Sequence, residues 1–193
     1  KLIDRVFLST DSKKYAEMGE RYGAEAPFLR PAKISGDHST DLDFVLHALD
    51  EFKKINLHPK YLVHIRPTTP IRDPEIIDSA ISLFMASNDF SSLRSVHKMS
   101  ESSYKTFEIT DCFLTPLPLA LGEKVDSNAP RQAFPDTYQA NGYVDILQTD
   151  YIIANKNIHG DQILPFITET AYEVDTIEDF YYLEYLTSKS DEI

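Results

Sequence analysis

Two carboxylates near the end of the chain have a spacing that suits a metal site. Glu173 and Asp175 lie two residues apart, just ahead of a predicted helix. In a strand, residues i and i+2 face the same side, so both carboxylates would point to one place. Such oxygen ligands suit Mg²⁺ or Mn²⁺, which commonly bridge to phosphates. Taken alone, an acidic edge followed by helix-capping residues explains the stretch better, because short motifs often match by chance.

Other polar groups follow predicted strands, where ligands bind in open α/β sheets. Arg66 and Arg72 flank a Pro-Thr-Thr-Pro turn. Guanidinium groups bind phosphate or carboxylate through paired hydrogen bonds, so a ligand site and an ordinary turn are evenly balanced here. Ordinary helix capping is the better explanation for residues 9–12. Arg131 and Asn141 are further candidates, although Asn141-Gly142 also fits a tight turn before a strand.

Strands and helices alternate along the first half of the chain. Helical spacing of apolar residues, together with capping residues at Thr40, Asp43, Asp73 and Pro74, predicts the helices. We expect strands at 5–9, 26–29 and 61–65, and helices at 13–22, from 39 or 40 to about 55, and from 74 onward. This alternation predicts an α/β domain with a mainly parallel sheet.

The second half changes character. We expect strands at 92–97, 104–109 and 143–147, a short helix at 149–154 and a last helix at about 177–186, with a further loop and the region 163–167 between the two helices. Residues 111–140 are rich in loops and prolines. A loop of that length is usually functional or lies at an interface.

Whole-chain properties narrow the function. The chain has 193 residues and a net charge of −12, which argues for one domain, residues 1–193, and against nucleic acid as a partner. The single Cys112 excludes an internal disulfide and fits a reducing compartment such as the cytoplasm. No apolar run reaches membrane-spanning length, so we expect no membrane partner.

Short motifs occur in a set order along nearly the whole chain. They lie at 6–11, 22–25, 28–32, 36–40, 45–49, 66–72, 131–132, 141–142 and 173–176. Each is weak alone, but their order and spacing resemble the CMP-sialic acid synthetase (acylneuraminate cytidylyltransferase) family of sugar-acid nucleotidyltransferases. The resemblance implies a Rossmann-like, three-layer nucleotidyltransferase fold (the nucleotide-diphospho-sugar transferase fold).

The same resemblance implies a reaction and its substrates. The anomeric hydroxyl of a 2-keto sugar acid would attack the α-phosphate of CTP, pyrophosphate would leave, and a CMP-sugar would form with Mg²⁺ required. An in-line displacement at phosphorus depends mainly on positioning and on neutralising the oxyanion charge.

Roles for individual residues also follow from the resemblance. Glu173 and Asp175 match the catalytic, metal-binding acidic pair. The segment of residues 98–141 resembles a dimerisation extension, which implies a homodimer with shared sites. Nucleotide contacts fall on Arg30, Asp37, Ser39 and Thr40, and sugar-acid contacts fall on Arg66, Thr68, Arg131 and Asn141, with Arg131 expected at the carboxylate.

Three positions depart from the family pattern. Glu173 stands where Asp is usual, Arg66 where Gln is common, and Asp145 where an aromatic residue often lies. Mg²⁺ accepts either carboxylate, whereas the other two changes suggest a different sugar substituent. A related nonulosonate, such as legionaminic or pseudaminic acid, therefore fits at least as well as sialic acid. A guanylyltransferase using GTP stays open as an alternative.

The family's first strand and its Gly/Lys/Arg-rich phosphate loop are not recognisable in these residues. A protein without them would bind CTP poorly and would be a catalytically incompetent, nucleotide- or sugar-binding relative. A protein that carries them ahead of Lys1 would be an active enzyme. We favour the second expectation, because loss of a central strand would expose a sheet edge and its core.

Overall fold

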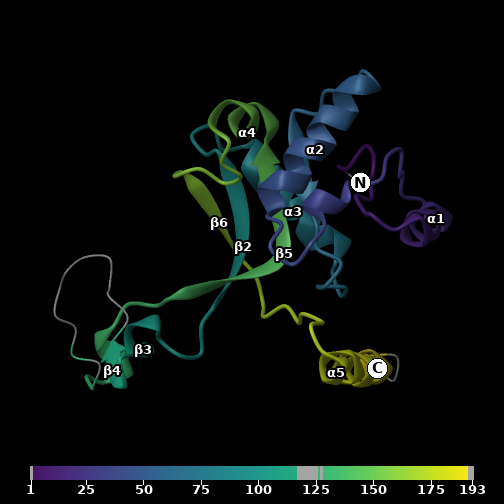
Figure 1. The fold of residues 1–193 in the computed structure, drawn as a ribbon. Coiled ribbons are helices and arrows are strands. Elements are labelled where there is room, and N and C mark those ends of the chain that lie inside the picture. The colour runs from purple at the N-terminus through teal and green to yellow at the C-terminus, as the bar shows by residue number, and fades with distance from the viewer. Residues whose placement is uncertain (1, 117–125, 127, 191–193) are drawn as a thin grey trace.

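The computed structural model describes residues 2–116, 126 and 128–190, which form an α/β body with two outlying parts (Figure 1). A four-stranded sheet lies at the centre of the body, in the order β1 (Tyr61–His64), β5 (Tyr138–Gln148), β2 (Ser92–Lys98) and β6 (Ile163–Ile167). β5 pairs antiparallel with β1 and with β2, whereas β2 and β6 are parallel. Three strands therefore run in one direction, and β5 runs against them between β1 and β2.

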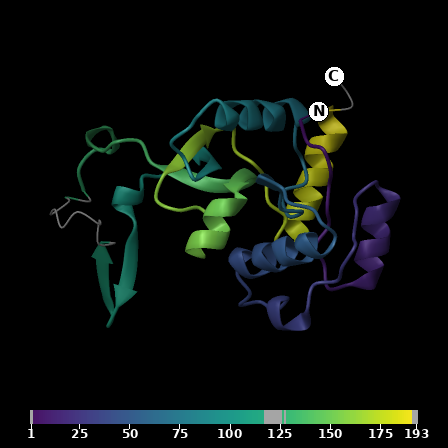
Figure 2. The same ribbon diagram turned by 90° about the horizontal axis from the view of Figure 1, so that it is seen from above.

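Helices cover both faces of this sheet. α3 (Pro74–Met85) lies on one face, and α2 (Asp41–Lys54) and α4 (Thr149–Asn155) lie on the other (Figure 2). The alternation of side chains along β5 divides the core, because successive residues point to opposite faces. Val144 and Ile146 pack in the α3 cluster, whereas Leu147 packs in the cluster of α2 and α4. The predicted three-layer α/β fold is confirmed, but the sheet is mixed, because two of its three described strand pairings are antiparallel.

The predicted helix signals appear at the ends of the helices. α1 (Lys13–Arg21) is followed by Gly23, whose φ of 89° is favourable only for glycine. Thr40 and Asp43 form the reciprocal capping box of α2, and Asp73 caps α3 with proline in its first turn. A single 3₁₀ turn, Ala32–Ile34, lies between α1 and α2.

Three predicted strands differ from the structure. Residues 5–9 and 26–29 do not form strands; the only pairing described there is an isolated parallel bridge between Phe7 and Glu25. Part of the stretch 104–109 forms a 3₁₀ turn, Ser103–Lys105, because the Ser102 hydroxyl accepts a hydrogen bond from the backbone N–H of Tyr104. Only the remainder pairs as a strand.

The outlying parts are an extension and the last helix. β3 (Phe107–Thr110) and β4 (Phe113–Pro116) form a hairpin away from the body, and the 3₁₀ turn Arg131–Ala133 precedes β5 (Figure 1). α5 (Ile177–Ser190) follows β6 through the segment of residues 168–176. Residues 117–125 and 127 of the predicted extension lie outside the described residues. None of the helices described has the length and apolar character needed to cross a membrane.

Candidate functional site

Glu173 lies against a gap that glycine leaves in β5. A Cβ atom built on Gly142 would lie 2.8 Å from Glu173 Oε1 and 3.1 Å from Thr69 Oγ1. Gly142 also has a φ of 63°, in the left-handed region that favours glycine. The Asn-Gly pair therefore lets a carboxylate and a hydroxyl approach the strand closely, which was not visible from the sequence.

A backbone hydrogen bond joins the predicted sugar-acid turn to the predicted acidic pair. The N–H of Val174 donates to the carbonyl of Thr68 at 2.7 Å. Thr68 follows β1 along the chain, and Val174 separates Glu173 from Asp175. The contact brings the end of β1 to the segment that follows β6, as expected for a site at the carboxyl ends of strands that run in the same direction.

Asn141 fastens that segment to β5. Its side chain is 3% exposed, and its Nδ2 donates to Thr168 Oγ1 at 2.7 Å. Its Oδ1 accepts from the backbone N–H of Tyr143 at 3.2 Å. Asn141 was predicted to contact the sugar acid; the contacts described give it a part in positioning the segment that carries Glu173.

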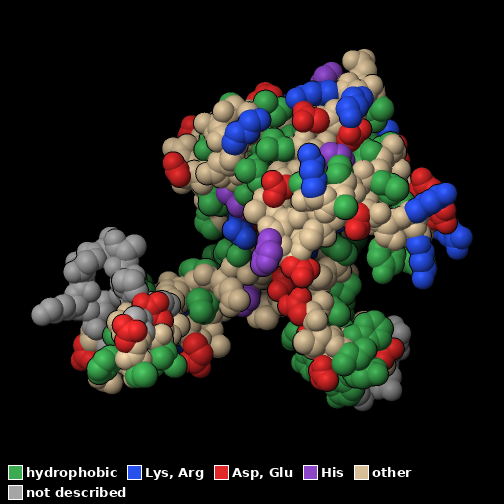
Figure 3. Space-filling model, viewed as in Figure 1, with side chains coloured by type: hydrophobic (Ala, Val, Ile, Leu, Met, Phe, Trp, Pro, Cys, Tyr) green, Lys and Arg blue, Asp and Glu red, His purple; other side chains and the backbone are tan. Residues whose placement is uncertain are grey.

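The stretch around the acidic pair is a loop, so the predicted strand geometry is wrong. Both Glu173 and Asp175 are exposed. The capping pattern falls on later residues: Asp179 Oδ2 accepts from the N–H and the hydroxyl of Thr176, each at 2.8 Å. Figure 3 shows acidic side chains gathered where the chain leaves the body toward α5. The helix-capping explanation therefore applies to Thr176 and Asp179 and leaves both carboxylates of the pair accessible.

The acidic pair fits a phosphate-bridging metal better than a fully protein-ligated one. Among residues 2–116, 126 and 128–190, no group of three or more His, Cys, Asp or Glu could hold a metal ion. Mg²⁺ is usually held by one or two carboxylates together with waters and substrate phosphates. The cradle beside Gly142, which a Cβ would fill, is consistent with this arrangement for Glu173.

Arg72 is occupied by the backbone around the site. Its Nε donates to the carbonyl of Tyr143 at 2.7 Å, and its Nη2 donates to the carbonyls of Arg66 at 2.7 Å and Gly142 at 3.0 Å. Its Nη1 donates to the carbonyl of Thr69. Burial, and then the nearby Arg66 charge, lower the pKa of Arg72. Arg72 thus holds the turn of residues 66–69 against β5.

Arg66 is also held, but by carboxylates. Its Nη2 contacts Asp41 at the start of α2, and its Nη1 lies 3.3 Å from Asp145 Oδ2. Burial acts against its charge, but the hydrogen bond and charge of Asp41, together with Asp145, raise the pKa of Arg66. The predicted sugar-acid arginine is therefore paired on two sides within the protein.

Asp145 is the centre of a polar cluster that was not predicted from the sequence, where Asp145 was noted only as a departure that suggests a different sugar substituent. Its side chain is 1% exposed, and its Oδ1 lies 3.8 Å from Arg94 Nε. Nδ1 of His64 and Nε2 of His159 each lie 4.0 Å from its Oδ2. The register explains the grouping, because Asp145 pairs with His64 of β1 and with Arg94 of β2. A charged residue inside the apolar run 143–147 was the available signal.

The histidines of this cluster favour the neutral form. Burial, and then the charge of Arg66, lower the pKa of His64. Burial is also the largest cause that lowers the pKa of His159, with Arg94 acting in the same direction. The cluster therefore balances two arginines against Asp145 and Asp41, with neutral imidazoles between them.

The predicted nucleotide residues approach this cluster from α2. The Arg30 guanidinium lies 5.4 Å from the Phe44 ring, whose centroid is 5.3 Å from that of His64. Thr40 uses its hydroxyl in the capping box, next to Asp41. Asp37 is exposed in the loop before the helix, with Ser39 half-buried beside it. Arg30 and Thr40 are thus tied to the cluster through Phe44 and the start of α2, and none of the contacts described joins these residues to Glu173.

Arg131 lies apart from the other predicted residues. It is exposed, and its Nη2 donates to the carbonyl of Met99 at 3.3 Å. It lines a small hollow of the extension with Ser102 and Phe134. Within the part of the chain described, nothing brings its guanidinium to the acidic pair.

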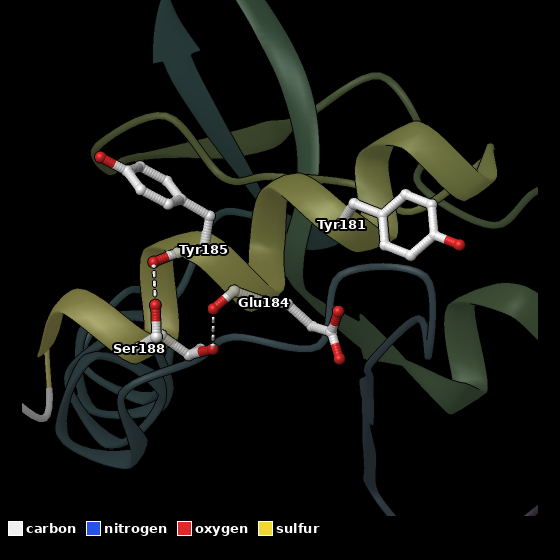
Figure 4. A pocket seen from close by; sticks show the side chains of 5 residues that line it. Tyr181, Glu184, Tyr185 and Ser188 are labelled. Carbon is white, nitrogen blue, oxygen red and sulfur yellow. Dashed lines mark hydrogen bonds between the residues drawn. The ribbon is translucent and has the colours of Figure 1, made fainter.

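Another hollow lies on α5 and is shown in Figure 4. Tyr181, Glu184, Tyr185 and Ser188 line it, and all belong to one helix. The two tyrosines point away from each other in Figure 4. None of the predicted site residues contributes to this hollow, so it is not the candidate site.

Comparisons with known proteins test the resemblance. No family model matches the chain. Post-translational flagellin modification protein B of Campylobacter coli is 25% identical over 191 residues, covering 96% of this chain and 78% of that protein. CMP-N,N'-diacetyllegionaminic acid synthase of Legionella pneumophila is 24% identical over 201 residues, covering 98% and 80%. N-acylneuraminate cytidylyltransferase of Escherichia coli is 25% identical over 93% of this chain and 41% of its own.

This chain is similar over nearly its whole length to sugar-acid cytidylyltransferases. The predicted resemblance to the CMP-sialic acid synthetase family is confirmed. A solved structure of CMP:2-keto-3-deoxy-manno-octonic acid synthetase, complexed with CTP, superposes with a TM-score of 0.67 over 97% of this chain and 82% of its own, at 10% identity. At that identity the likeness shows the nucleotidyltransferase fold alone.

Proposed function

We propose that this protein is a cytidylyltransferase that joins CMP from CTP to a 2-keto sugar acid and releases pyrophosphate. The sugar acid is a nonulosonate of the sialic, legionaminic or pseudaminic type. The observation that carries the proposal is the meeting of the Glu173 carboxylate, the Thr69 hydroxyl and Gly142 at the strand ends. Similarity to relatives named for this activity over 93–98% of the chain supports it.

Each part of the site has a task in such a reaction. Glu173 and Asp175 would hold Mg²⁺, or Mn²⁺ in its place, which would neutralise charge on the triphosphate. Asn141 and Arg72 hold the segments that carry the acidic pair and the turn. The loop of Asp37, Ser39 and Thr40, with Arg30, contacts the nucleotide. The turn that contains Arg66 and Thr68 borders the place of the sugar acid, with the Arg66 side chain held by Asp41 and Asp145.

The proposal includes a homodimer in which the extension completes a neighbouring site. Three side chains of the β3–β4 hairpin are strongly exposed: Ile109 at 79%, Phe113 at 74% and Leu114 at 67%. Exposed apolar groups gathered on one hairpin indicate an interface between proteins. A partner's extension would then bring Arg131 to the sugar carboxylate, which its own chain does not do. The free, exposed Cys112 is consistent with a reducing compartment, for which we propose the cytoplasm.

Pyrophosphate release tests the activity. The full-length protein is incubated with CTP, Mg²⁺ and a panel of nonulosonic acids, and GTP replaces CTP in a parallel series. We expect release with CTP and at least one acid, and loss of release when EDTA removes the metal. No release with any combination would contradict the proposal.

A matched pair of variants tests the metal site. Glu173→Gln removes the charge that lies beside Gly142 and should lower kcat about 100-fold or more, because phosphoryl chemistry depends on charge neutralisation. Glu178→Gln changes an exposed acid in the first turn of α5 and should leave kcat within about twofold. Equal kcat values in the two variants would show that Glu173 holds no essential metal.

A further inference from the structure

Asp145 is costly to bury in its present environment. Its carboxylate is 1% exposed, and its Oδ1 has no hydrogen-bond partner among the described residues. A buried ion pair is often no more stabilising than apolar residues of similar volume, whereas a buried charge that loses its partner is strongly destabilising. Fold stability alone therefore does not account for a carboxylate at the centre of this sheet.

The carboxylate begins a path of contacts that ends at the acidic pair. Asp145 Oδ2 accepts from Arg66 at 3.3 Å. The carbonyl of Arg66 accepts from the N–H of Thr69 at 3.2 Å, which closes the turn. The carbonyl of Thr68, inside that turn, accepts from the N–H of Val174 at 2.7 Å. The Arg66 side chain also lines the cradle, because its Cδ lies 3.7 Å from the Cβ position on Gly142.

We propose that Asp145 is a positioning residue, which holds Arg66 and, through the turn of residues 66–69, holds Glu173 and Asp175 in place. The effect on catalysis rests on the proposed cytidylyltransferase function. Asp145 touches neither substrate nor metal in this arrangement; it acts only through Arg66. Asp41 holds the other side of the same guanidinium, so the path also joins the turn to the start of α2.

The competing explanation is that Arg72 alone fixes the turn. Its guanidinium already donates to the carbonyls of Arg66 and Thr69. In that case Asp145 would be an ordinary buried polar residue, and its replacement would lower stability without loosening the turn. The two explanations differ in what happens at the Thr69 and Val174 amides.

Amide hydrogen exchange of the full-length protein reads the positioning without any substrate. In Asp145→Asn we expect the Thr69 and Val174 amides to exchange at least about tenfold faster than in the wild type, because opening of a local segment is governed by its own contacts. The matched control is Thr149→Val. It removes a buried hydroxyl that donates to the carbonyl of Pro59 at 2.7 Å, at the first residue of α4 and outside the path of contacts from Asp145 to Val174. In the control, the exchange rates of the Thr69 and Val174 amides, each divided by the rates of the α1 amides, should equal those of the wild type.

A double-mutant cycle reads the effect on the reaction. Asp145→Asn and Arg66→Gln should each lower kcat/KM for the sugar acid about 10- to 100-fold, since small misplacement of reacting groups is costly. For Asp145→Asn the loss should lie mainly in kcat. The double variant should be no more than about threefold worse than the poorer single variant, because both changes break one contact. Thr149→Val should stay within about twofold of the wild type.

The results separate this inference from the proposed function. Unchanged exchange of Thr69 and Val174 in Asp145→Asn, or losses of kcat/KM that multiply in the double variant, would overturn the positioning role. A wild type that releases no pyrophosphate would contradict the proposed function instead. Faster exchange at both amides together with non-multiplicative losses would support both.

Discussion

The turn of residues 66–72 and the extension of residues 98–141 were both predicted to contact the sugar acid, and the structure builds them in opposite ways. The turn is held by its own two arginines. Arg72 donates to a backbone carbonyl of the turn and to one of β5, and Arg66 bonds to the carboxylates of Asp41 and Asp145. The extension stands away from the body, and its Arg131 has one described hydrogen bond, to the carbonyl of Met99.

The difference separates two uses of arginine. A guanidinium has five donors in a fixed plane, so one bonded to several protein oxygens fixes geometry and has few donors left for a ligand. An exposed guanidinium with a single bond keeps most of its donors. By this argument the turn supplies the shape of the site, and the extension supplies the accessible positive charge.

The largest effect is expected for Gly142→Ala, which lies beside the turn of residues 66–72. The new Cβ would lie 2.8 Å from Glu173 Oε1, at a φ of 63° that L-residues adopt with strain. We expect kcat/KM to fall at least about 100-fold, because the carboxylate must move. Gly23→Ala is the control: its φ is 89°, but a Cβ there meets nothing within 4 Å. The control should lose about 1 kcal/mol of stability and little activity. Similar activity in the two variants would show that the cradle is not needed.

Arg131→Ala tests the open region. We expect KM for the sugar acid to rise about tenfold with kcat nearly unchanged, as for an interaction made equally in the ground and transition states. Its stability should change by less than about 0.5 kcal/mol, because the side chain is exposed. Lys98→Ala removes another cation of the extension, which pairs with Asp136 at 2.7 Å, and serves as the control. A fall in kcat alone, or equal KM values for both variants, would show that Arg131 does not bind the carboxylate of the sugar acid.

Acid should affect the cluster behind the turn more than the extension. Burial, with Arg66 or Arg94, lowers the pKa of His64 and His159 in the folded protein, so the unfolded chain takes up their protons first as the pH falls. Their contribution to stability is complete above about pH 6.5 and is lost as the pH falls toward the lowered values. Each histidine can change the unfolding free energy by up to about 1.4 kcal/mol per pH unit.

Urea unfolding at pH 7 and pH 5.5 measures this effect. The double variant His64→Gln and His159→Gln should lose less stability between the two pH values than the wild type does. His38→Gln, at an exposed position, should behave like the wild type. An identical pH dependence in the double variant would mean that the imidazoles of His64 and His159 do not account for the loss.

Local signals predicted much of the fold and part of the site. The capping residues Thr40 and Asp73 marked the starts of two helices correctly, because a cap depends on residues three or fewer positions away. The same short range explains the errors at residues 5–9 and 173–175. Whether an extended stretch becomes a strand depends on partners from elsewhere in the chain. Residues 5–9 have one isolated bridge, and residues 173–175 have one backbone hydrogen bond to the turn.

The Asp145 cluster shows what the sequence does not contain. Arg66 and Asp145 were noticed separately as departures from the family pattern, yet they are hydrogen-bonded across 79 residues of chain. Only the register of β5 between β1 and β2 brings His64 and Arg94 to the same carboxylate. Two separate departures from the family pattern are thereby one contact between a guanidinium and a buried carboxylate.

The smallest effect concerns Thr40, which was predicted to contact the nucleotide and which caps α2 in the structure. Thr40→Ala should lower the unfolding free energy by about 1 kcal/mol, and Thr40→Ser should restore most of it, since either hydroxyl can accept from the N–H of Asp43. If capping is the main task, KM for CTP changes less than about threefold in both variants, as for losses unrelated to ligand contacts. A larger rise in KM for CTP in Thr40→Ala, reversed by serine at equal stability, would show that the hydroxyl also contacts the nucleotide. The start of α2 would then both fix local geometry, as the turn does, and contact a ligand, as proposed for the extension.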